Sequence, residues 1–159
     1  MIAKECCISK GVGKSKNGLP SFDKALIEAG VGNYNLVRLS SILPAIHEWV
    51  PVQSLPVKLK EGSLLPTAYS TITSDEVGDT IISCIGVGIP VDSNNVCVIM
   101  EYSTKNISET EAMGTLHEMI REAFSVRGWL LDNIISDYAM AKVEEEGTKY
   151  TTFACIAEW

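Results

Sequence analysis

Residues 80–89 constrain the fold more than any other stretch of this sequence. Nearly every position from Thr80 to Ile89 is apolar or small, without the polar–apolar alternation of a strand that has one wet face. Because strand side chains point alternately to the two faces of a sheet, a strand of this kind must be covered on both. Gly86 and Gly88 within it predict a bend or a close approach of another backbone.

The rest of the pattern predicts a single domain over residues 1–159. One amphipathic helix follows Ser21, a favourable N-cap, and ends at Gly30; a second follows the capping box that begins at Ser108 and ends at Gly128. Two helices with mainly antiparallel strands favour the α+β class and a four-layer helix–sheet–sheet–helix sandwich. The predicted strands are residues 3–9, 33–41, 64–73, 80–89, 96–102, 131–143 and 149–157, the last two as a hairpin.

Two stretches are predicted to be loops. In residues 10–20, Gly13-Lys14-Ser15 looks like the end of a phosphate-binding loop, but Ile8 stands where that motif needs its first glycine. Residues 46–62 are irregular in pattern and rich in proline.

Charge and composition exclude several function classes. The net charge is −7 and 46% of the 159 residues are hydrophobic. An acidic chain is a poor binder of nucleic acid or of anionic membranes, so a cationic small molecule is the more natural partner.

There is no secretory signal and no apolar run of about 18 residues, which indicates a cytoplasmic protein with no membrane span. With two histidines and no C-x-x-C pair, the five cysteines are expected to be buried free thiols and no metal site is expected.

The pair Ser40-Ser41, at the end of the strand predicted from Asn33, could produce a catalytic group. If the Ser41 hydroxyl attacks the Ser40 carbonyl, the peptide bond becomes an ester, and strain of about 1–3 kcal/mol at such a position would help. Elimination then leaves a Ser40 carboxylate and a dehydroalanine that hydrolyses to a pyruvoyl group. On the residues alone, a pair of turn-forming serines is the simpler interpretation.

Four segments carry a resemblance to a known family: residues 22–44, Leu65-Pro66-Thr67-Ala68-Tyr69, Ile99-Met100-Glu101-Tyr102 and Arg127-Gly128-Trp129. Together they resemble the archaeal type of pyruvoyl-dependent arginine decarboxylase. The resemblance implies a proenzyme that cuts itself into a β chain (1–40) and an α chain (41–159), with a pyruvoyl group from Ser41 and neither metal nor pyridoxal phosphate. It also implies conversion of L-arginine to agmatine and CO2 through a Schiff base, in polyamine biosynthesis, by a homotrimer with the four-layer fold.

Glu101 is the candidate proton donor. Strand alternation places it on the same face as Cys97 and Ile99, and apolar neighbours favour the neutral carboxyl that a general acid needs. A solvent-facing carboxylate at a strand end is the alternative on spacing alone. The resemblance implies the role of proton donor.

The remaining candidates are Asp23, Gly32, Asn35 and Ser40. Asp23 is expected in the first turn of its helix, where it could serve the helix dipole or accept a guanidinium bidentately. Asn35 would share a face with Ser41 if the strand were regular, and its amide could polarise the Ser40 carbonyl. Gly32 could allow close approach of substrate or form the helix exit. The resemblance implies substrate binding for Asp23, Gly32 and Ser40, and processing or positioning for Asn35.

Two alternatives stay open at this point. The same chemistry could act on another basic amino acid, because one carboxylate does not measure the length of a pocket. The chain could also be a non-catalytic binding or assembly module that is never cut, in which the serines only pack.

Overall fold

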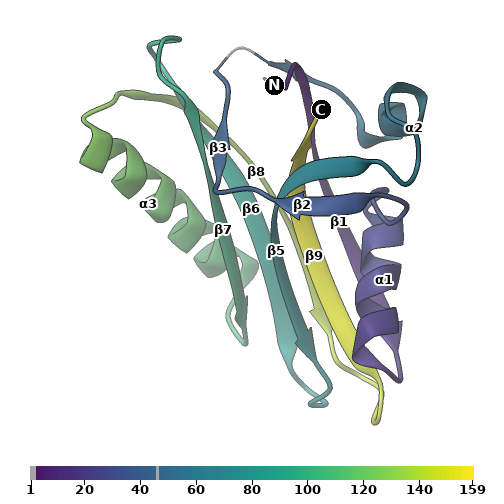
Figure 1. The fold of residues 1–159 in the computed structure, drawn as a ribbon. Helices are drawn as coiled ribbons and strands as arrows, with labels where there is room; N and C mark the ends of the chain where they lie inside the picture. Colours follow the sequence, from purple (N-terminus) through teal and green to yellow (C-terminus); the bar gives the residue numbers. More distant parts are fainter. Residues whose placement is uncertain (1–2, 46) are drawn as a thin grey trace.

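The computed structural model describes residues 3–45 and 47–159. They form two β-sheets and the helices that cover them (Figure 1). The strand order is β2-β5-β9-β1-β4 in the five-stranded sheet and β3-β7-β6-β8 in the four-stranded sheet. The strands are β1 (Glu5–Ser15), β2 (Asn35–Arg38), β3 (Ile42–Leu43), β4 (Glu48–Trp49), β5 (Leu64–Ser74), β6 (Thr80–Pro90), β7 (Cys97–Lys105), β8 (Leu131–Lys142) and β9 (Lys149–Glu158). The helices are α1 (Gly18–Glu28), α2 (Leu55–Lys58) and α3 (Glu109–Arg127), with a 3-10 turn η1 (Val52–Ser54).

The strand pairing confirms the α+β class and its mainly antiparallel character. Only the β1–β4 and β2–β5 pairs are parallel among the pairs in the described residues. The same residues contain no helix that is both long enough and apolar enough to cross a membrane.

Helix α1 lies directly on β1 because two glycines make room for it. A Cβ atom at Gly11 would stand 2.1 Å from the carbonyl oxygen of Ala25, and one at Gly13 would stand 2.0 Å from that of Ser21. Strand β1 therefore continues to Ser15 and α1 begins at Gly18, so the prediction of a loop over residues 10–20 is wrong except at residues 16 and 17. Glycines that read as loop formers serve here for close packing of a helix on a strand.

The first helix begins earlier than predicted. Its N-cap is Asn17, and Ser21 is buried inside the helix, where its hydroxyl lies 2.7 Å from both the Gly18 carbonyl oxygen and Thr151 Oγ1. Asp23 consequently lies beyond the first turn and is exposed, which removes the predicted helix-dipole role. The helix exit at Gly30, with φ of 78°, is as predicted.

An apolar cluster fills the space between the two sheets. Its buried members come from both sheets, so the inner face of each is covered by the other. They are Cys6, Leu43, Ala68, Ile85, Val87, Cys97, Ile99, Ala154 and Ile156. A second cluster joins α1 to the outer face of the five-stranded sheet, and a third joins α3 to the outer face of the four-stranded sheet.

Strand β6 and helix α3 agree with their predictions. The β6 side chains are buried on both faces, and a Cβ atom at Gly88 would meet Phe124 of α3 at 2.5 Å. The helix starts with the complete capping box of Ser108 and Glu111 and ends at Gly128, whose φ is 67°. The glycines of β6 therefore make room for side chains, mainly those of α3, and not for another backbone as predicted.

The predicted hairpin of residues 131–143 and 149–157 is wrong. Both segments are strands, but β8 pairs with β6 in one sheet and β9 pairs with β1 and β5 in the other. Strand β9 is buried on both faces because α1 covers one face and the four-stranded sheet covers the other, and β1 and β5 pair with its two edges.

Residues 47–62 are more structured than the predicted loop. They include β4, η1 and α2, and the side chain of Leu55 is fully buried. The position before them, residue 46, lies outside the described residues.

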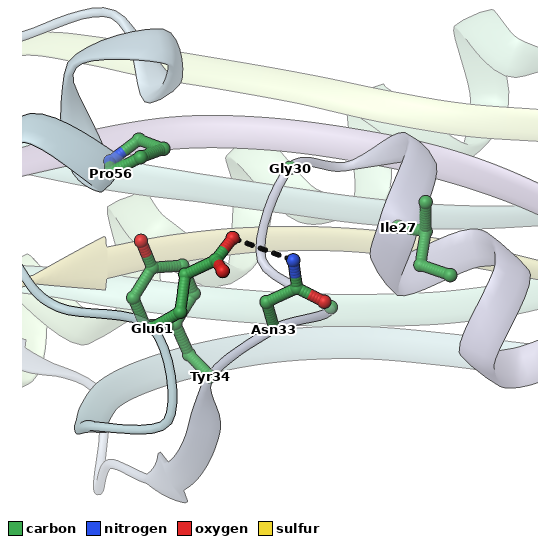
Figure 2. Close-up of a pocket in the computed structure, with 7 residues that line it drawn as sticks. Ile27, Gly30, Asn33, Tyr34, Pro56 and Glu61 are labelled. Carbon is green, nitrogen blue, oxygen red and sulfur yellow. Dashed lines mark hydrogen bonds between the residues drawn. The ribbon is translucent and has the colours of Figure 1, made fainter.

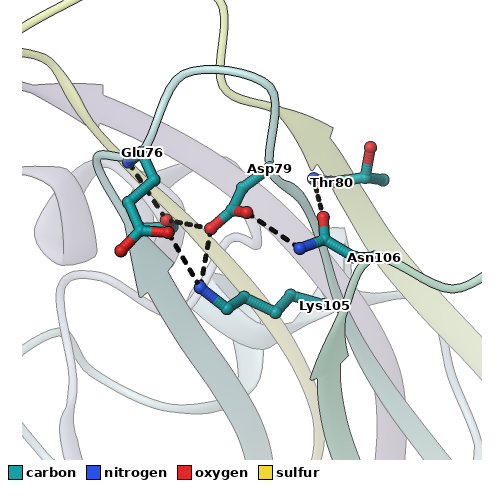
Figure 3. Close-up of polar contacts among 6 residues, drawn as sticks. Glu76, Asp79, Thr80, Lys105 and Asn106 are labelled. Carbon is teal, nitrogen blue, oxygen red and sulfur yellow. Dashed lines mark hydrogen bonds and ion pairs between the residues drawn. The ribbon is translucent and has the colours of Figure 1, made fainter.

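A polar cluster ties the β5–β6 turn to the end of β7 (Figure 3). Asp79 is 7% exposed and accepts hydrogen bonds from Ser74, Lys105 and Asn106 at 2.7 to 2.9 Å. These bonds, that from Asn106 first, lower the pKa of the Asp79 carboxyl to about 2. Lys105 also pairs with Glu76 at 3.3 Å. The hydrogen bonds of Asp79 thus join the β5–β6 turn to the end of β7.

Candidate active site

The chain crosses from one sheet to the other at Ser40-Ser41. Strand β2 pairs with β5 as far as Arg38, and β3 pairs with β7 from Ile42 onward. The predicted single strand is therefore two short strands in different sheets, with the serine pair as the connection between them. Figure 1 shows this connection between the ends of β2 and β3.

Ser41 has a left-handed backbone conformation, with φ of 70°. This region is sterically unfavourable for residues other than glycine. The Ser41 carbonyl oxygen accepts a hydrogen bond from the Ile99 amide at 2.8 Å, which fixes the peptide on the far side of the serine. The surrounding strands thus hold a strained serine at the predicted cleavage point.

The Ser41 hydroxyl donates a hydrogen bond to Glu101. The distance from Oγ to Glu101 Oε1 is 3.1 Å, and the Glu101 side chain is 19% exposed. Cys97 and Ile99, four and two residues before it on β7, belong to the cluster between the sheets, so Glu101 lies on the predicted face at the rim of that cluster. The two residues with the main predicted roles are therefore in contact.

Arg38, which has no predicted role, also contacts Glu101. Its guanidinium donates to Glu101 Oε2 at 3.0 Å and to the Tyr69 carbonyl oxygen at 3.3 Å, and it lies over the Tyr69 ring at 4.7 Å from the centroid. The hydrogen bond to Glu101 raises the pKa of Arg38. Glu101 therefore has a cation in direct contact in addition to the apolar neighbours expected from the strand pattern.

A small polar hollow adjoins these groups. Its volume is about 150 Å³. The lining residues are Arg38, Tyr69, Ser70, Thr71, Glu101 and Ser103. Such a lining suits a polar or charged ligand better than an apolar one.

Asp23 and Gly32 lie elsewhere in the single chain. Asp23 is exposed on α1, which packs on the outer face of the five-stranded sheet, and no hydrogen bond or ion pair links it to Ser41 or Glu101 among the described residues. Gly32 packs against the end of α1, where a Cβ atom would stand 2.8 Å from the Ile27 amide nitrogen. This close approach to the helix explains the glycine without a substrate.

Gly32 also lines a second hollow, of about 210 Å³, beside the end of α1 (Figure 2). Asn33 and Glu61 face each other across it, with a hydrogen bond of 2.7 Å from Asn33 Nδ2 to Glu61 Oε1. Tyr34 and Pro56 form another part of its wall. The hollow thus offers one carboxylate in an otherwise uncharged lining.

Asn35 does not contact the serine pair. Its amide donates to the Gly62 carbonyl oxygen at 2.7 Å. The alternation that predicted a shared face fails because β2 ends at Arg38, before the chain turns at Ser41.

The five cysteines are free and buried, as predicted. Desolvation raises the pKa of Cys7, Cys84 and Cys97 to about 11 each. Thiols of this kind are poor nucleophiles near neutral pH. Within residues 3–45 and 47–159, no three or more His, Cys, Asp or Glu side chains are grouped as metal ligands would be.

Sequence comparison finds similarity along nearly the whole chain. The family model described as pyruvoyl-dependent arginine decarboxylase (PvlArgDC) matches residues 5–159. The protein named pyruvoyl-dependent arginine decarboxylase from Methanocaldococcus jannaschii is 44% identical over 149 residues, and that from Methanococcus aeolicus is 41% identical over 149 residues. Each alignment covers 94% of this chain and 86% of the relative. The protein of the same name from Thermococcus sibiricus is 44% identical over 127 residues, or 80% of this chain and 78% of that protein.

Proposed function

The chain belongs to the pyruvoyl-dependent arginine decarboxylase family, and from this membership we propose that it cuts itself between Ser40 and Ser41 and then converts L-arginine to agmatine and CO2. The observation that carries the proposal is the contact of a strained Ser41 with Glu101 at the crossover between the sheets. The cut would give a β chain of residues 1–40 and an α chain of residues 41–159.

The cutting step uses groups of the chain itself. Ser41 Oγ bonds to the Ser40 carbonyl carbon, the C–N bond breaks, and an ester replaces the peptide. Elimination then breaks the bond from Cβ to the ester oxygen, leaving a Ser40 carboxylate and a dehydroalanine at residue 41. Water converts the dehydroalanine to a pyruvoyl group and releases ammonia. The left-handed φ of Ser41, the bond from Ile99 to its carbonyl oxygen and the bond from its hydroxyl to Glu101 support this route.

The residues at the site fit a pyruvoyl group at position 41. A pyruvoyl group supplies an electrophilic carbonyl that condenses with an amine and withdraws electrons. Glu101 touches residue 41 and is our candidate for the group that delivers a proton to the substrate carbon after CO2 leaves; a positioned acid typically contributes about 10²–10⁴-fold to the rate. The adjoining hollow supports binding of a polar substrate there.

Substrate binding by Asp23, Gly32 and Ser40, and positioning by Asn35, are further parts of the proposal. Because Asp23 and Gly32 do not contact Ser41 within one chain, the proposed homotrimer is the arrangement that could unite them with the Ser41 site of a neighbouring copy. Apolar side chains at the surface support such an interface: Leu19 and Ile27 on α1 are 78% and 59% exposed, and Val37 beside the crossover is 43% exposed.

The proposal includes the overall architecture and location. Three apolar clusters support a single domain with a four-layer helix–sheet–sheet–helix arrangement. One lies between the two sheets, and one lies on the outer face of each sheet. Free buried cysteines support a reducing, cytoplasmic location.

The test is the intact mass of the purified chain under denaturing conditions. Two fragments, of residues 1–40 and 41–159, are expected, and the larger one should lack a free amine and react with borohydride. Ser41→Ala should remain whole and inactive. A wild-type chain that stays whole after long incubation would favour the uncut binding or assembly module instead.

Substrate choice needs a separate measurement. The expected result is that kcat/KM for arginine exceeds that for ornithine and lysine, because the guanidinium can bind a carboxylate bidentately. Higher activity on ornithine or lysine would keep the chemistry and change the substrate.

A further inference from the structure

Arg38 is held by more contacts than an ordinary surface ion pair. Its side chain is 58% exposed, yet the guanidinium is fixed by Glu101, by the Tyr69 carbonyl and by stacking on the Tyr69 ring. An exposed pair alone contributes little to stability, so these contacts suggest a role other than stability. The planar guanidinium suits both the stacking and the carboxylate, whereas a lysine ammonium would lose the stacked fork geometry.

Glu101 has its two oxygens committed to different partners. Oε2 accepts from Arg38 and Oε1 accepts from the Ser41 hydroxyl. The carboxylate is therefore oriented by one partner while it faces the other. An ionised oxygen that accepts a hydrogen bond from a hydroxyl is placed to take the proton of that hydroxyl.

The charged and titratable groups around Glu101 come from several strands. Arg38 on β2 and Tyr69 on β5 line the same hollow as Glu101. On its own sheet, Glu101 pairs with Ile85 of β6, which pairs with Asp137 of β8, so Asp137 faces the same side two strands away. Asp137 is itself paired with Lys10 of β1 at 2.7 Å. Among these groups, Arg38 is the cation in contact with Glu101.

We propose that Arg38 is a positioning residue for self-cleavage: its guanidinium holds the Glu101 carboxyl group aimed at the Ser41 hydroxyl in the uncut chain. The proton of Ser41 Oγ then passes to Glu101 as Oγ bonds to the Ser40 carbonyl carbon, and the Ser41 nitrogen gains a proton as the C–N bond breaks. This inference rests on the proposed function, since it assigns a residue to the proposed cut.

The experiment follows the rate of cleavage of the full chain after cell-free synthesis, by mass under denaturing conditions at neutral pH. The variants are Arg38→Met, which removes the charge, and Arg38→Lys, which keeps it. Lys149→Met is the matched control, because Lys149 also forms an exposed ion pair, with Asp75 at 2.6 Å, on other elements. Thermal unfolding of each variant checks the fold, and Arg38 is exposed enough that its removal should leave the midpoint nearly unchanged.

The expected result has three parts. Arg38→Met should cut at least about tenfold more slowly near neutral pH, a fraction of the usual effect of a positioned proton acceptor. Arg38→Lys should regain part of the rate, and Lys149→Met should match the wild type.

Two results would overturn the inference. One is a wild-type rate of cutting in Arg38→Met. The other is an equal slowing in Arg38→Met and Arg38→Lys, with no partial recovery in Arg38→Lys, which indicates a merely structural role. A wild-type chain that is never cut would instead refute the proposed function, so the two failures can be told apart.

Discussion

At the scale of single residues, Ser41 combines a reactive hydroxyl with a conformation that side chains other than glycine adopt at a cost. Its φ of 70° lies in the left-handed region, where the cost for a non-glycine residue is about 1–2 kcal/mol. The crossover between sheets imposes this conformation, since the flanking residues are fixed by β5 on one side and β7 on the other. The fold thus maintains strain at the peptide that is proposed to be cut.

This strain can be measured with two variants that lack the hydroxyl. Neither Ser41→Ala nor Ser41→Gly should be cut, so both remain single chains suited to equilibrium unfolding. Ser41→Gly should be the more stable by about 0.5–1 kcal/mol, because relief of the left-handed strain outweighs the greater entropy of glycine in the unfolded chain. Urea unfolding gives the difference; a more stable Ser41→Ala would mean that the backbone there is not strained.

Asp79 provides a pH-dependent contribution to stability. Its folded pKa of about 2 lies below the ordinary 3.8, so the contribution is complete above about pH 4 and is lost as the pH falls toward 2. The free energy of unfolding should therefore fall over this range, and less steeply in Asp79→Asn. Asp75→Asn is the control: its pKa is also lowered, by Lys149, but its side chain is 52% exposed and its effect should be smaller. Equal slopes in wild type and Asp79→Asn would contradict the assignment.

The sequence identifies some site residues better than others. Glu101 is placed on its correct face by strand alternation, because β7 is regular from Cys97 onward. Its partner Arg38 could not be found in this way, since the pairing depends on where β2 stops and on which strand lies opposite. The same break in β2 makes the prediction of a shared face for Asn35 and Ser41 wrong, and the Asn35 amide donates to the Gly62 carbonyl oxygen.

At the scale of elements, glycines decide how closely helices approach strands. Gly11→Ala should destabilise the fold by about 1–3 kcal/mol or more, because the added methyl would collide with backbone of α1 2.1 Å away, which cannot move as a side chain can. Gly114→Ala in α3 should instead stabilise by up to about 1 kcal/mol, because nothing lies within 4 Å of the new methyl and alanine favours the helix. Thermal unfolding of the pair tests this, and similar midpoints would refute the packing argument.

Elements were predictable where the signal is local, and less so where it depends on partners. The capping box at Ser108 and the doubly covered β6 follow from residues next to one another in sequence. The hairpin prediction fails because the pattern of β9 marks it as a strand but does not say whether β8, β1 or β5 lies beside it. Likewise, the glycines of β1 have meaning only once α1 is placed above them.

At the scale of the whole molecule, the proposed cut divides the strands of one sheet between two chains. Strands β1 and β2 precede residue 41, and β4, β5 and β9 follow it. Strand β1 lies between β9 and β4, with paired residues from Cys6 to Ser15 along β9, and β2 pairs with β5. We therefore expect the cut fragments to stay together through gel filtration in the absence of denaturant and to separate in urea; early dissociation would contradict this.

Strand β1 lies between strands that follow the crossover in the sequence. The proposed cut should therefore hardly change the size or the shape of the molecule. A preparation could be wholly processed, half processed or unprocessed and elute at the same volume, with only its covalent state different. The enzyme would then be a complex of two different chains made from one translation product. The β and α chains would be assembled before the cut and would not have to meet by diffusion.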